Sequence, residues 1–468
     1  MAENRKYFFC GVGGSGMLPL AAILKARGAD VAGSDRSLDQ GRLGAKFDYL
    51  KSLGVDLFPQ DGSGVVSADQ TLVASAAIED TVPDVAAAKR LGARRVTRAE
   101  ALSELFNASD LAIGVAGTSG KSTTTAMIAW ILAATGRDPT VMNGAVMKNF
   151  VSDAAPFASA RIGDGPAFVS EIDESDGSIA LFRPRIAVLN NIAHDHKSME
   201  ELRRLFSEFV AKSETAVINL DHEETARFAD QRHSAALTYA IDRNDADFVA
   251  DDIDLGPTSA RFLARDAARD EDAQVTLKMP GRHNVANALA AITAASAAGV
   301  PLRAAAAALT DFEGVKRRFD IVGEAAGVTV IDDFAHNPDK IAATLRTMKR
   351  FPGRVLAVFQ PHGFGPIRTM KDGFIEAFAA GLGPDDLLWM PEPVYFGGTV
   401  ERTVSSQSIV DALVEKGVNA TAAATRDDCV DDIVATARAD DRLIVMGARD
   451  DTLSEFAANL LVRIKAKS

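Results

Sequence analysis

The segment Gly117–Thr125, with the sequence GTSGKSTTT, constrains the fold of this chain more than any other feature. It follows the apolar run 111–116, which is typical of a buried strand, and precedes 126–134, which is typical of a helix. In such a phosphate loop the backbone N–H groups cradle phosphates, Lys121 reaches the β and γ phosphates, and the Ser122 hydroxyl binds Mg²⁺. The form is short, because Val115 stands where longer versions have glycine. We therefore predict a nucleoside triphosphate site, in preference to a Ser/Thr-rich helix cap.

A second glycine-rich segment, Gly11–Gly16, fits G-x-G-x-x-G between an expected strand at 7–11 and an expected helix at 17–27. Asp35 ends the next expected strand, where an acid that binds a ribose would sit. The pattern fits an NAD-dependent dehydrogenase, another diphosphate ligand such as a nucleotide sugar, or a tight turn without a ligand. The phosphate loop in the following segment argues against a simple dehydrogenase.

Short apolar strands alternate with helical segments along the whole chain, which predicts parallel sheets covered by helices. We expect an α/β protein of three domains: a Rossmann-like domain at 1–108, a central P-loop domain at 109–313 and a Rossmann-like domain at 314–468. The stretch 242–272 is dense in Asp and Arg, and we expect a solvated edge hairpin without a function there.

Composition excludes several classes of function. The 468 residues include 51 basic and 64 acidic side chains, a net charge of −13 that argues against broad nucleic-acid binding. No apolar run approaches the roughly 18 residues of a membrane span, and the polar start of the chain does not resemble a signal peptide. The two cysteines, Cys10 and Cys429, predict buried thiols in a reducing compartment. We expect a cytoplasmic protein; the sequence does not indicate its oligomeric state.

Two polar clusters follow expected strands of the central domain. The acidic turn, residues 171–176, follows a strand at 167–171, and the asparagine turn, residues 190–196, follows a strand at 186–190. Ligands of open α/β sheets bind at the carboxyl ends of the strands, so both turns should face the phosphate loop. Carboxylates and an imidazole there suit Mg²⁺ held against phosphates, although solvated surface turns would give the same pattern.

The ordered set of these motifs resembles the Mur ligase family over nearly the whole chain. The matching segments are Gly117–Thr125, Glu171–Asp176, Asn191 with Asp195 and His196, Gly281–Asn284 with Asn287, Lys316–Phe319, Asp332–Pro338, Gln360–His362 with Arg368, and Met446–Ala448. The resemblance implies an ATP-dependent ligase of peptidoglycan biosynthesis. It would join an amino acid, L-alanine in the most similar branch, to the lactyl carboxylate of UDP-N-acetylmuramate through an acyl phosphate.

The resemblance also implies roles for individual residues. Lys121, Glu171 and His196 would be catalytic, and Ser122, Glu171 and His196 would hold Mg²⁺, with two ions expected. ATP would be bound by Gly117, Thr118, Ser119, Gly120, Lys121, Ser122, Thr123, His283, Asn284, Asn287, Arg318 and Asp333. The UDP-sugar would be bound by Gly13, Gly14, Ser15, Gly16, Met17, Asp35 and Ser75, and the amino acid by His336 and Arg368. The third domain would bind the amino acid and close on ATP.

Several positions leave the added amine open. Ser119 stands where related chains carry His, and 363–366 and 395–398 depart from the alanine-adding branch. Phe334 and Ala335 are similar to the branch that recycles the murein tripeptide. Lys212 lies near the place of a carbamylated lysine in some members, although an ordinary exposed lysine is the simpler interpretation. A paralogue with another amine, an NAD-dependent oxidoreductase and a non-catalytic nucleotide-sugar binder remain as alternatives.

Overall fold

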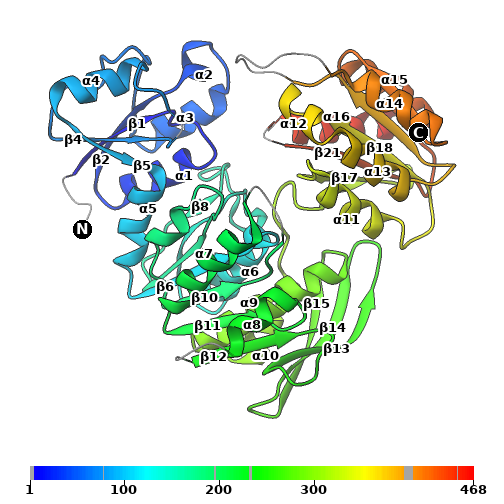
Figure 1. Cartoon of the computed structure of the whole chain (residues 1–468), viewed down its shortest axis with the longest axis horizontal. Coiled ribbons are helices and arrows are strands. Elements are labelled where there is room, and N and C mark those ends of the chain that lie inside the picture. Colours follow the sequence, from blue (N-terminus) through cyan, green and yellow to red (C-terminus); the bar gives the residue numbers. More distant parts are fainter. Residues whose placement is uncertain are drawn as a thin grey trace. The chain divides into compact units, whose positions relative to one another are not determined.

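A computed structural model describes residues 5–76, 78–193, 197–230, 235–394, 404–448, 450 and 452–467. The chain divides into two compact units. The first comprises Met1–Asp254, Ala260–Lys278 and Arg282–Val315, and the second comprises Leu255–Ser259, Met279–Gly281 and Lys316–Ser468. Over the described residues the strands form three sheets, of five, ten and six strands, coloured from blue to red along the chain in Figure 1.

The first sheet is parallel and has the strand order β3-β2-β1-β4-β5. Its elements are β1 (Lys6–Cys10), α1 (Met17–Ala26), β2 (Asp30–Ser34), α2 (Arg36–Asp39), α3 (Gly44–Ser52), β3 (Asp56–Phe58), β4 (Gln70–Ala74), α4 (Pro83–Leu91), β5 (Arg94–Thr97) and α5 (Arg98–Asn107). Phe8 and Phe9 point to opposite faces of β1 and both are fully buried, because helices cover both faces. The strand order reverses beside β1, so the glycine loop (residues 11–16) opens at the switch point where such sheets bind ligands.

The second sheet has the order β15-β14-β13-β12-β11-β10-β6-β9-β7-β8. Its strands are β6 (Leu111–Ala116), β7 (Thr140–Met142), β8 (Ala160–Arg161), β9 (Ala167–Glu171), β10 (Ile186–Leu189), β11 (Thr215–Asn219), β12 (Ala235–Ala240), β13 (Phe248–Leu255), β14 (Ala260–Asp266) and β15 (Glu271–Leu277). The associated helices are α6 (Lys121–Ala134), α7 (Met199–Ala211), α8 (Glu223–Asp230), α9 (Arg282–Ala297) and α10 (Leu302–Thr310), with 3-10 turns at Lys148–Phe150 and Ser178–Leu181. Because β6 lies between β10 and β9, the loop after β6 is flanked by the turns after both neighbours.

The stretch 242–272 is more than the predicted solvated hairpin. It contains β13 and β14 and the start of β15, and these strands extend the second sheet. Phe248, Phe262 and Ala264 are buried there, whereas the charged side chains alternate with them along β14. The charge density therefore marks only one face of a half-buried sheet.

The second unit holds a sheet of order β16-β17-β21-β18-β19-β20, in which β16 is antiparallel to β17 and the other pairs are parallel. Its elements are β16 (Asp320–Ala325), β17 (Val328–Asp333), α11 (Pro338–Met348), β18 (Val355–Gln360), α12 (Phe364–Thr369), α13 (Lys371–Gly381), β19 (Leu387–Pro391), α14 (Ser406–Glu415), β20 (Asn419–Ala423), a 3-10 turn at Asp427–Cys429, α15 (Val430–Thr436), β21 (Arg442–Gly447) and α16 (Thr452–Lys467).

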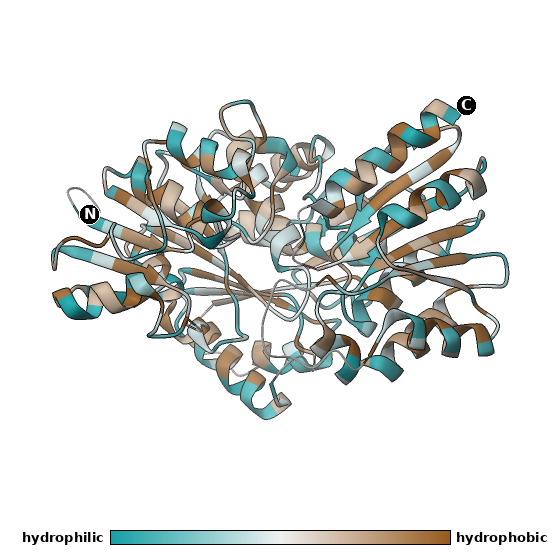
Figure 2. Cartoon of the chain, turned by 90° about the horizontal axis from the view of Figure 1, so that it is seen from above, coloured by the Kyte–Doolittle hydropathy of each residue, from teal (hydrophilic) through white to brown (hydrophobic). Residues whose placement is uncertain are grey.

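Hydropathy follows this architecture. In Figure 2 the strands are mainly brown, and the helices carry both brown and teal positions, as amphipathic helices on a buried sheet do. Cys10 and Cys429 are free and buried, as predicted. Among the described helices none is long and apolar enough to cross a membrane.

Candidate active site

The phosphate loop (residues 117–125) connects β6 to α6, as predicted, but the helix begins earlier than expected. It starts at Lys121, whereas the sequence pattern predicted a start at 126. Gly120 precedes it with φ +83°, a left-handed conformation that glycine adopts at little cost. Ser122 and Thr123 are therefore in the first helical turn, where the backbone N–H groups have no partner within the helix and are available to phosphate.

The asparagine turn holds the tip of this loop, so it faces the phosphate loop as expected. The Ser119 N–H donates to Asn191 Oδ1 at 2.9 Å, and Asn191 Nδ2 donates to the Ser119 carbonyl at 3.1 Å. The Thr118 N–H donates to the Asn191 carbonyl at 3.0 Å, and the Ala193 N–H donates to the Thr118 hydroxyl at 2.9 Å. His194, Asp195 and His196, which include the predicted catalytic and metal-binding imidazole, lie outside the described residues.

Lys121 contacts the other predicted turn through Glu174. Its Nζ lies 2.9 Å and 3.3 Å from the two carboxylate oxygens of Glu174, and it donates to the Gly117 carbonyl at 2.7 Å. Only 14% of the lysine side chain and 7% of the glutamate side chain are exposed. The sequence motif 171–176 contains four carboxylates and did not indicate which of them would reach the lysine.

The charges around this pair shift several pKa values. Burial opposes the charge of Lys121, but Glu174, Glu171 and Asp173 outweigh it and raise the lysine pKa. Burial raises the pKa of Glu174, although Lys121 pulls it down. Burial also opposes the charge of Asp173, yet hydrogen bonding by Ser175 and the charges of Lys121 and Arg98 lower its pKa. The site is therefore an electrostatically coupled cluster in which the lysine stays protonated.

A buried hydrogen-bond network of the Asn190 and Asn287 amides and the Thr124 hydroxyl holds the end of the phosphate loop. Asn190 Nδ2 donates to the Thr124 hydroxyl at 3.0 Å, and that hydroxyl lies 3.3 Å from Asn287 Oδ1. A β-carbon on Gly120 would lie 2.4 Å from Asn287 Oδ1 and 3.0 Å from Asn190 Nδ2. Asn287 Nδ2 also donates to Asn284 Oδ1, one turn earlier on α9, at 3.3 Å. The structure thus joins α9 to the phosphate loop through Asn287, a contact that the sequence did not predict.

Two predicted Mg²⁺ ligands lie next to one turn after β7. The Ser122 carbonyl accepts from Asn143 Nδ2 at 3.0 Å, and Glu171 Oε2 accepts from the Gly144 N–H at 3.2 Å. Within the described ranges no three His, Cys, Asp or Glu side chains gather as a metal site. A hydroxyl and one carboxylate nevertheless fit Mg²⁺, because this ion takes most of its other ligands from phosphates and water.

The glycine loop of the first sheet is shaped by Asp35. Its Oδ2 accepts from the Gly13 N–H at 2.9 Å and its Oδ1 from the Ser37 N–H at 2.8 Å, so both oxygens bind backbone. Gly14 and Ser15 are exposed at the loop, and Met17 is buried under it. Ser75 is exposed directly after β4, the strand beside β1. The predicted UDP-sugar residues therefore gather at one switch point.

The predicted residues of the second unit follow neighbouring strands. Asp333 ends β17 and accepts from the Phe319 N–H at 3.0 Å and the Thr344 hydroxyl at 2.6 Å. The Arg318 guanidinium lies 4.5 Å from the centre of the Phe334 ring. His336 Nδ1 lies 2.8 Å from the Phe334 carbonyl.

Arg368 is exposed on α12, after β18. Its guanidinium makes no hydrogen bond or ion pair with the described part of the chain. His283 is exposed in the first turn of α9 in the first unit, and residues 395–398 lie outside the described ranges.

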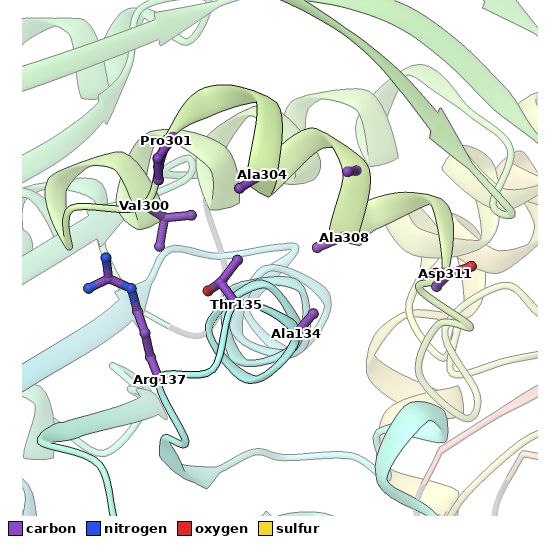
Figure 3. A pocket seen from close by; sticks show the side chains of 9 residues that line it. Ala134, Thr135, Arg137, Val300, Pro301, Ala304, Ala308 and Asp311 are labelled. Atoms are coloured by element: carbon purple, nitrogen blue, oxygen red, sulfur yellow. The ribbon is translucent and has the colours of Figure 1, made fainter.

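Two further features lie apart from the phosphate loop. Lys212 is exposed, and its Nζ donates to the Ala180 carbonyl at 2.5 Å. A pocket of about 600 Å³ lies between the end of α6 and α10. Figure 3 shows the side chains that line it. Its lining includes Ala134 and Thr135, at the opposite end of the helix that begins with Lys121, about 20 Å away along the axis. This pocket is therefore separate from the nucleotide site.

Three α/β sheets and a phosphate loop between β6 and α6 define a class: a multidomain nucleotide-binding α/β enzyme. The chain belongs to the Mur ligase family. Residues 6–110 match the "Mur ligase family, catalytic domain", residues 115–295 the "Mur ligase middle domain" and residues 317–449 the "Mur ligase, glutamate ligase domain". Members of this family are ATP-dependent enzymes that form amide bonds, so the chain is an ATP-dependent ligase, and ATP dependence implies Mg²⁺.

Two curated proteins that are similar to this chain carry the same name. The UDP-N-acetylmuramate–L-alanine ligase of Sorangium cellulosum is 36% identical and aligns over 99% of this chain and 97% of its own length. The enzyme of the same name from Gloeobacter violaceus is 33% identical over 97% of this chain and 95% of its own length.

Solved structures share the fold. The UDP-N-acetylmuramate–alanine ligase of Thermotoga maritima has a TM-score of 0.79 at 24% identity and covers 99% of this chain and 100% of its own. A murein peptide ligase from Psychrobacter arcticus has a TM-score of 0.71 at 25% identity and covers 99% of each chain.

Proposed function

We propose that this chain uses ATP to join L-alanine to the lactyl carboxylate of UDP-N-acetylmuramate, in peptidoglycan biosynthesis. The observation that carries the proposal is the pairing of two ligand-binding switch points in one unit. The glycine loop opens beside β1, and the phosphate loop opens between the acidic and asparagine turns. The names of the full-length relatives supply the amine and the nucleotide sugar.

A carboxylate is a poor acyl donor at neutral pH, so ATP activates it. The lactyl carboxylate attacks the γ-phosphate, the resulting acyl phosphate is attacked by the amine, and phosphate and ADP leave. Such phosphoryl transfer depends on positioning and charge neutralisation. We assign Lys121 to the transferring phosphate, because its ammonium is buried and held charged.

Mg²⁺ would neutralise the phosphate charge when bound. We assign one ion to Ser122 and Glu171, whose neighbours Asn143 and Gly144 hold them at one turn, and a second ion to His196. The remaining phosphate contacts come from Gly117, Thr118, Ser119, Gly120 and Thr123. His283, Asn284 and Asn287 bind the adenine end, and Asn287 also supports the loop beneath Gly120.

The remaining assignments follow the three sheets. Residues 1–108 would bind the nucleotide sugar, 109–313 ATP, and 314–468 the amino acid, and the three matched family segments support these boundaries. Gly13, Gly14, Ser15, Gly16, Met17 and Ser75 bind the UDP-sugar, while Asp35 keeps the loop in shape. Arg318 and Asp333 bind ATP, and His336 and Arg368 bind the amino acid as the third domain closes.

We propose a cytoplasmic location, because the proposed reaction uses ATP and a nucleotide sugar. Two free buried thiols suit that reducing compartment.

A second candidate is ligation of a murein tripeptide to the same carboxylate. The similarity to a murein peptide ligase structure and the Phe334-Ala335 pair favour it. The two candidates differ in the amine and share the nucleotide site.

The test is ADP release with ATP, Mg²⁺ and UDP-N-acetylmuramate against L-alanine, L-serine, glycine and the tripeptide. We expect turnover with L-alanine above all other amines. Turnover with the tripeptide alone would replace the proposal by the second candidate. No ADP release with any amine would refute both, and an absorbance change with NAD would favour an oxidoreductase.

A further inference from the structure

Arg98, the first residue of α5, differs from the other arginines around it. Arg94 pairs with Glu104, and Arg95 pairs with Asp80 at 2.6 Å. The guanidinium of Arg98 makes no hydrogen bond or ion pair with any part of the chain that the structure describes. It is nevertheless only partly exposed. Its hydrogen-bond donors are therefore available to an anionic ligand.

The backbone beneath Arg98 is fixed. Thr97 caps α5 by accepting from the Glu100 N–H at 3.1 Å, and the Glu100 carboxylate accepts from the Thr97 N–H at 2.6 Å. This capping box holds the helix start in one conformation. The direction in which the Arg98 side chain leaves the helix is therefore set before any ligand arrives.

The side chain lies against the glycine loop. A β-carbon on Gly16 would lie 2.9 Å from Cδ, 3.2 Å from Nε and 3.4 Å from Nη1 of Arg98. Any residue other than glycine at this position would displace the arginine. The last glycine of the G-x-G-x-x-G pattern thus makes room for a cation, in addition to allowing the loop to approach a ligand.

The Arg98 guanidinium therefore lies beside the loop proposed for the nucleotide sugar. The proposed substrate carries a diphosphate and a carboxylate, and both are anionic groups of the kind that a guanidinium binds.

We propose that Arg98 binds an anionic group of the nucleotide-sugar substrate, either its diphosphate or its carboxylate. The planar guanidinium can donate two parallel hydrogen bonds to such a group. The inference rests on the proposed function, because it takes the substrate to be UDP-linked. Gly16 admits the side chain, and the Thr97–Glu100 cap aims it.

The test is calorimetric binding of UDP-N-acetylmuramate to the full-length protein and its R98A and R98K variants. The matched control is R95A, which removes an exposed arginine three residues earlier. We expect R98A to weaken binding about 10- to 100-fold, as loss of a charge-assisted hydrogen-bonded pair does. We expect R98K to regain part of the loss, because it keeps the charge without the fork. R95A should bind as the wild type does.

Binding of UDP-N-acetylglucosamine, which has the diphosphate but lacks the carboxylate, shows which of the two groups Arg98 binds. An equal loss for both nucleotide sugars assigns Arg98 to the diphosphate, and a loss confined to UDP-N-acetylmuramate assigns it to the carboxylate. Wild-type affinity in R98A would overturn the inference. An equal loss of affinity for a non-hydrolysable ATP analogue would also overturn it, since that pattern indicates a structural role. Failure of the wild type to bind UDP-N-acetylmuramate would instead refute the proposed function, and this inference with it.

Discussion

Replacement of Lys121 by alanine tests the buried pair at the centre of the candidate site. Only 14% of Lys121 and 7% of Glu174 side-chain surface is exposed, so K121A leaves an almost fully buried carboxylate without its partner. Removal of one member of such a pair costs about 3–5 kcal/mol of folding free energy. E174Q should cost less, about 1–3 kcal/mol, because Lys121 still donates a hydrogen bond to the Gly117 carbonyl at 2.7 Å.

The double variant isolates the interaction. In K121A/E174Q neither charge of the pair is left buried without the other. The double variant should therefore lose less free energy of unfolding than the sum of the losses in the two single variants, by about 1–3 kcal/mol. Urea unfolding can be followed in this unit alone, because the chain has two tryptophans and W389F leaves Trp130 on α6 as the reporter. A K121A loss below about 1 kcal/mol, or strictly additive losses, would refute the reasoning.

The stability of the single variant K121A should depend on pH. Burial already raises the pKa of Glu174 in the presence of Lys121, and removal of the lysine charge should raise it further. When the pKa of a carboxyl is higher in the folded protein than in the unfolded chain, its contribution to the free energy of unfolding is lost as the pH rises through the folded-state pKa. The deficit of K121A relative to the wild type should therefore shrink as pH falls from about 7 to about 5. A constant deficit over that range would show that Glu174 is not the stranded charge.

Three further predictions concern the phosphate loop. G120A should lower kcat at least tenfold, because its β-carbon would lie 2.4 Å from Asn287 Oδ1 and the left-handed backbone conformation costs a non-glycine residue about 1–2 kcal/mol. The control is G136A, where φ is +76° and no atom lies within 4 Å of the added β-carbon. It has the backbone strain without the collision and should keep its kcat. N191A should weaken ATP binding about tenfold in a fluorescent-nucleotide titration, because two hydrogen bonds to Ser119 are lost; unchanged affinity would contradict this. E171Q should raise the Mg²⁺ concentration for half-maximal rate about 10- to 100-fold, and EDTA should abolish turnover; an unchanged Mg²⁺ dependence would remove Glu171 from the metal site.

Much of the fold could be predicted from the sequence. The strand boundaries at 111–116, 167–171 and 215–219 match, because apolar runs between polar turns indicate buried parallel strands. The start of α6 was wrong by five residues. Ser and Thr have low helix propensity, so the run Ser122–Thr125 was interpreted as loop. A left-handed Gly120 and burial of Thr124 and Thr125 start the helix there instead.

The candidate site was predicted in outline only. Motif spacing indicated that the acidic and asparagine turns would meet the phosphate loop, because the strands before them are neighbours of β6. It did not indicate that Glu174, rather than Glu171 or Asp173, would reach Lys121. Asn287 beneath Gly120 and Arg98 beside Gly16 were also missed. These contacts join segments more than 80 residues apart, and only the packing of helices on the sheets brings them together.

Mass spectrometry of the products tests the central claim most directly. UDP-N-acetylmuramate with ¹⁸O in its lactyl carboxylate is incubated with the protein, ATP, Mg²⁺ and L-alanine. An acyl phosphate route predicts UDP-N-acetylmuramoyl-L-alanine together with inorganic phosphate that carries one ¹⁸O, because the transferred phosphate keeps one carboxylate oxygen. Unlabelled phosphate, or ADP without the alanine conjugate, would contradict the account.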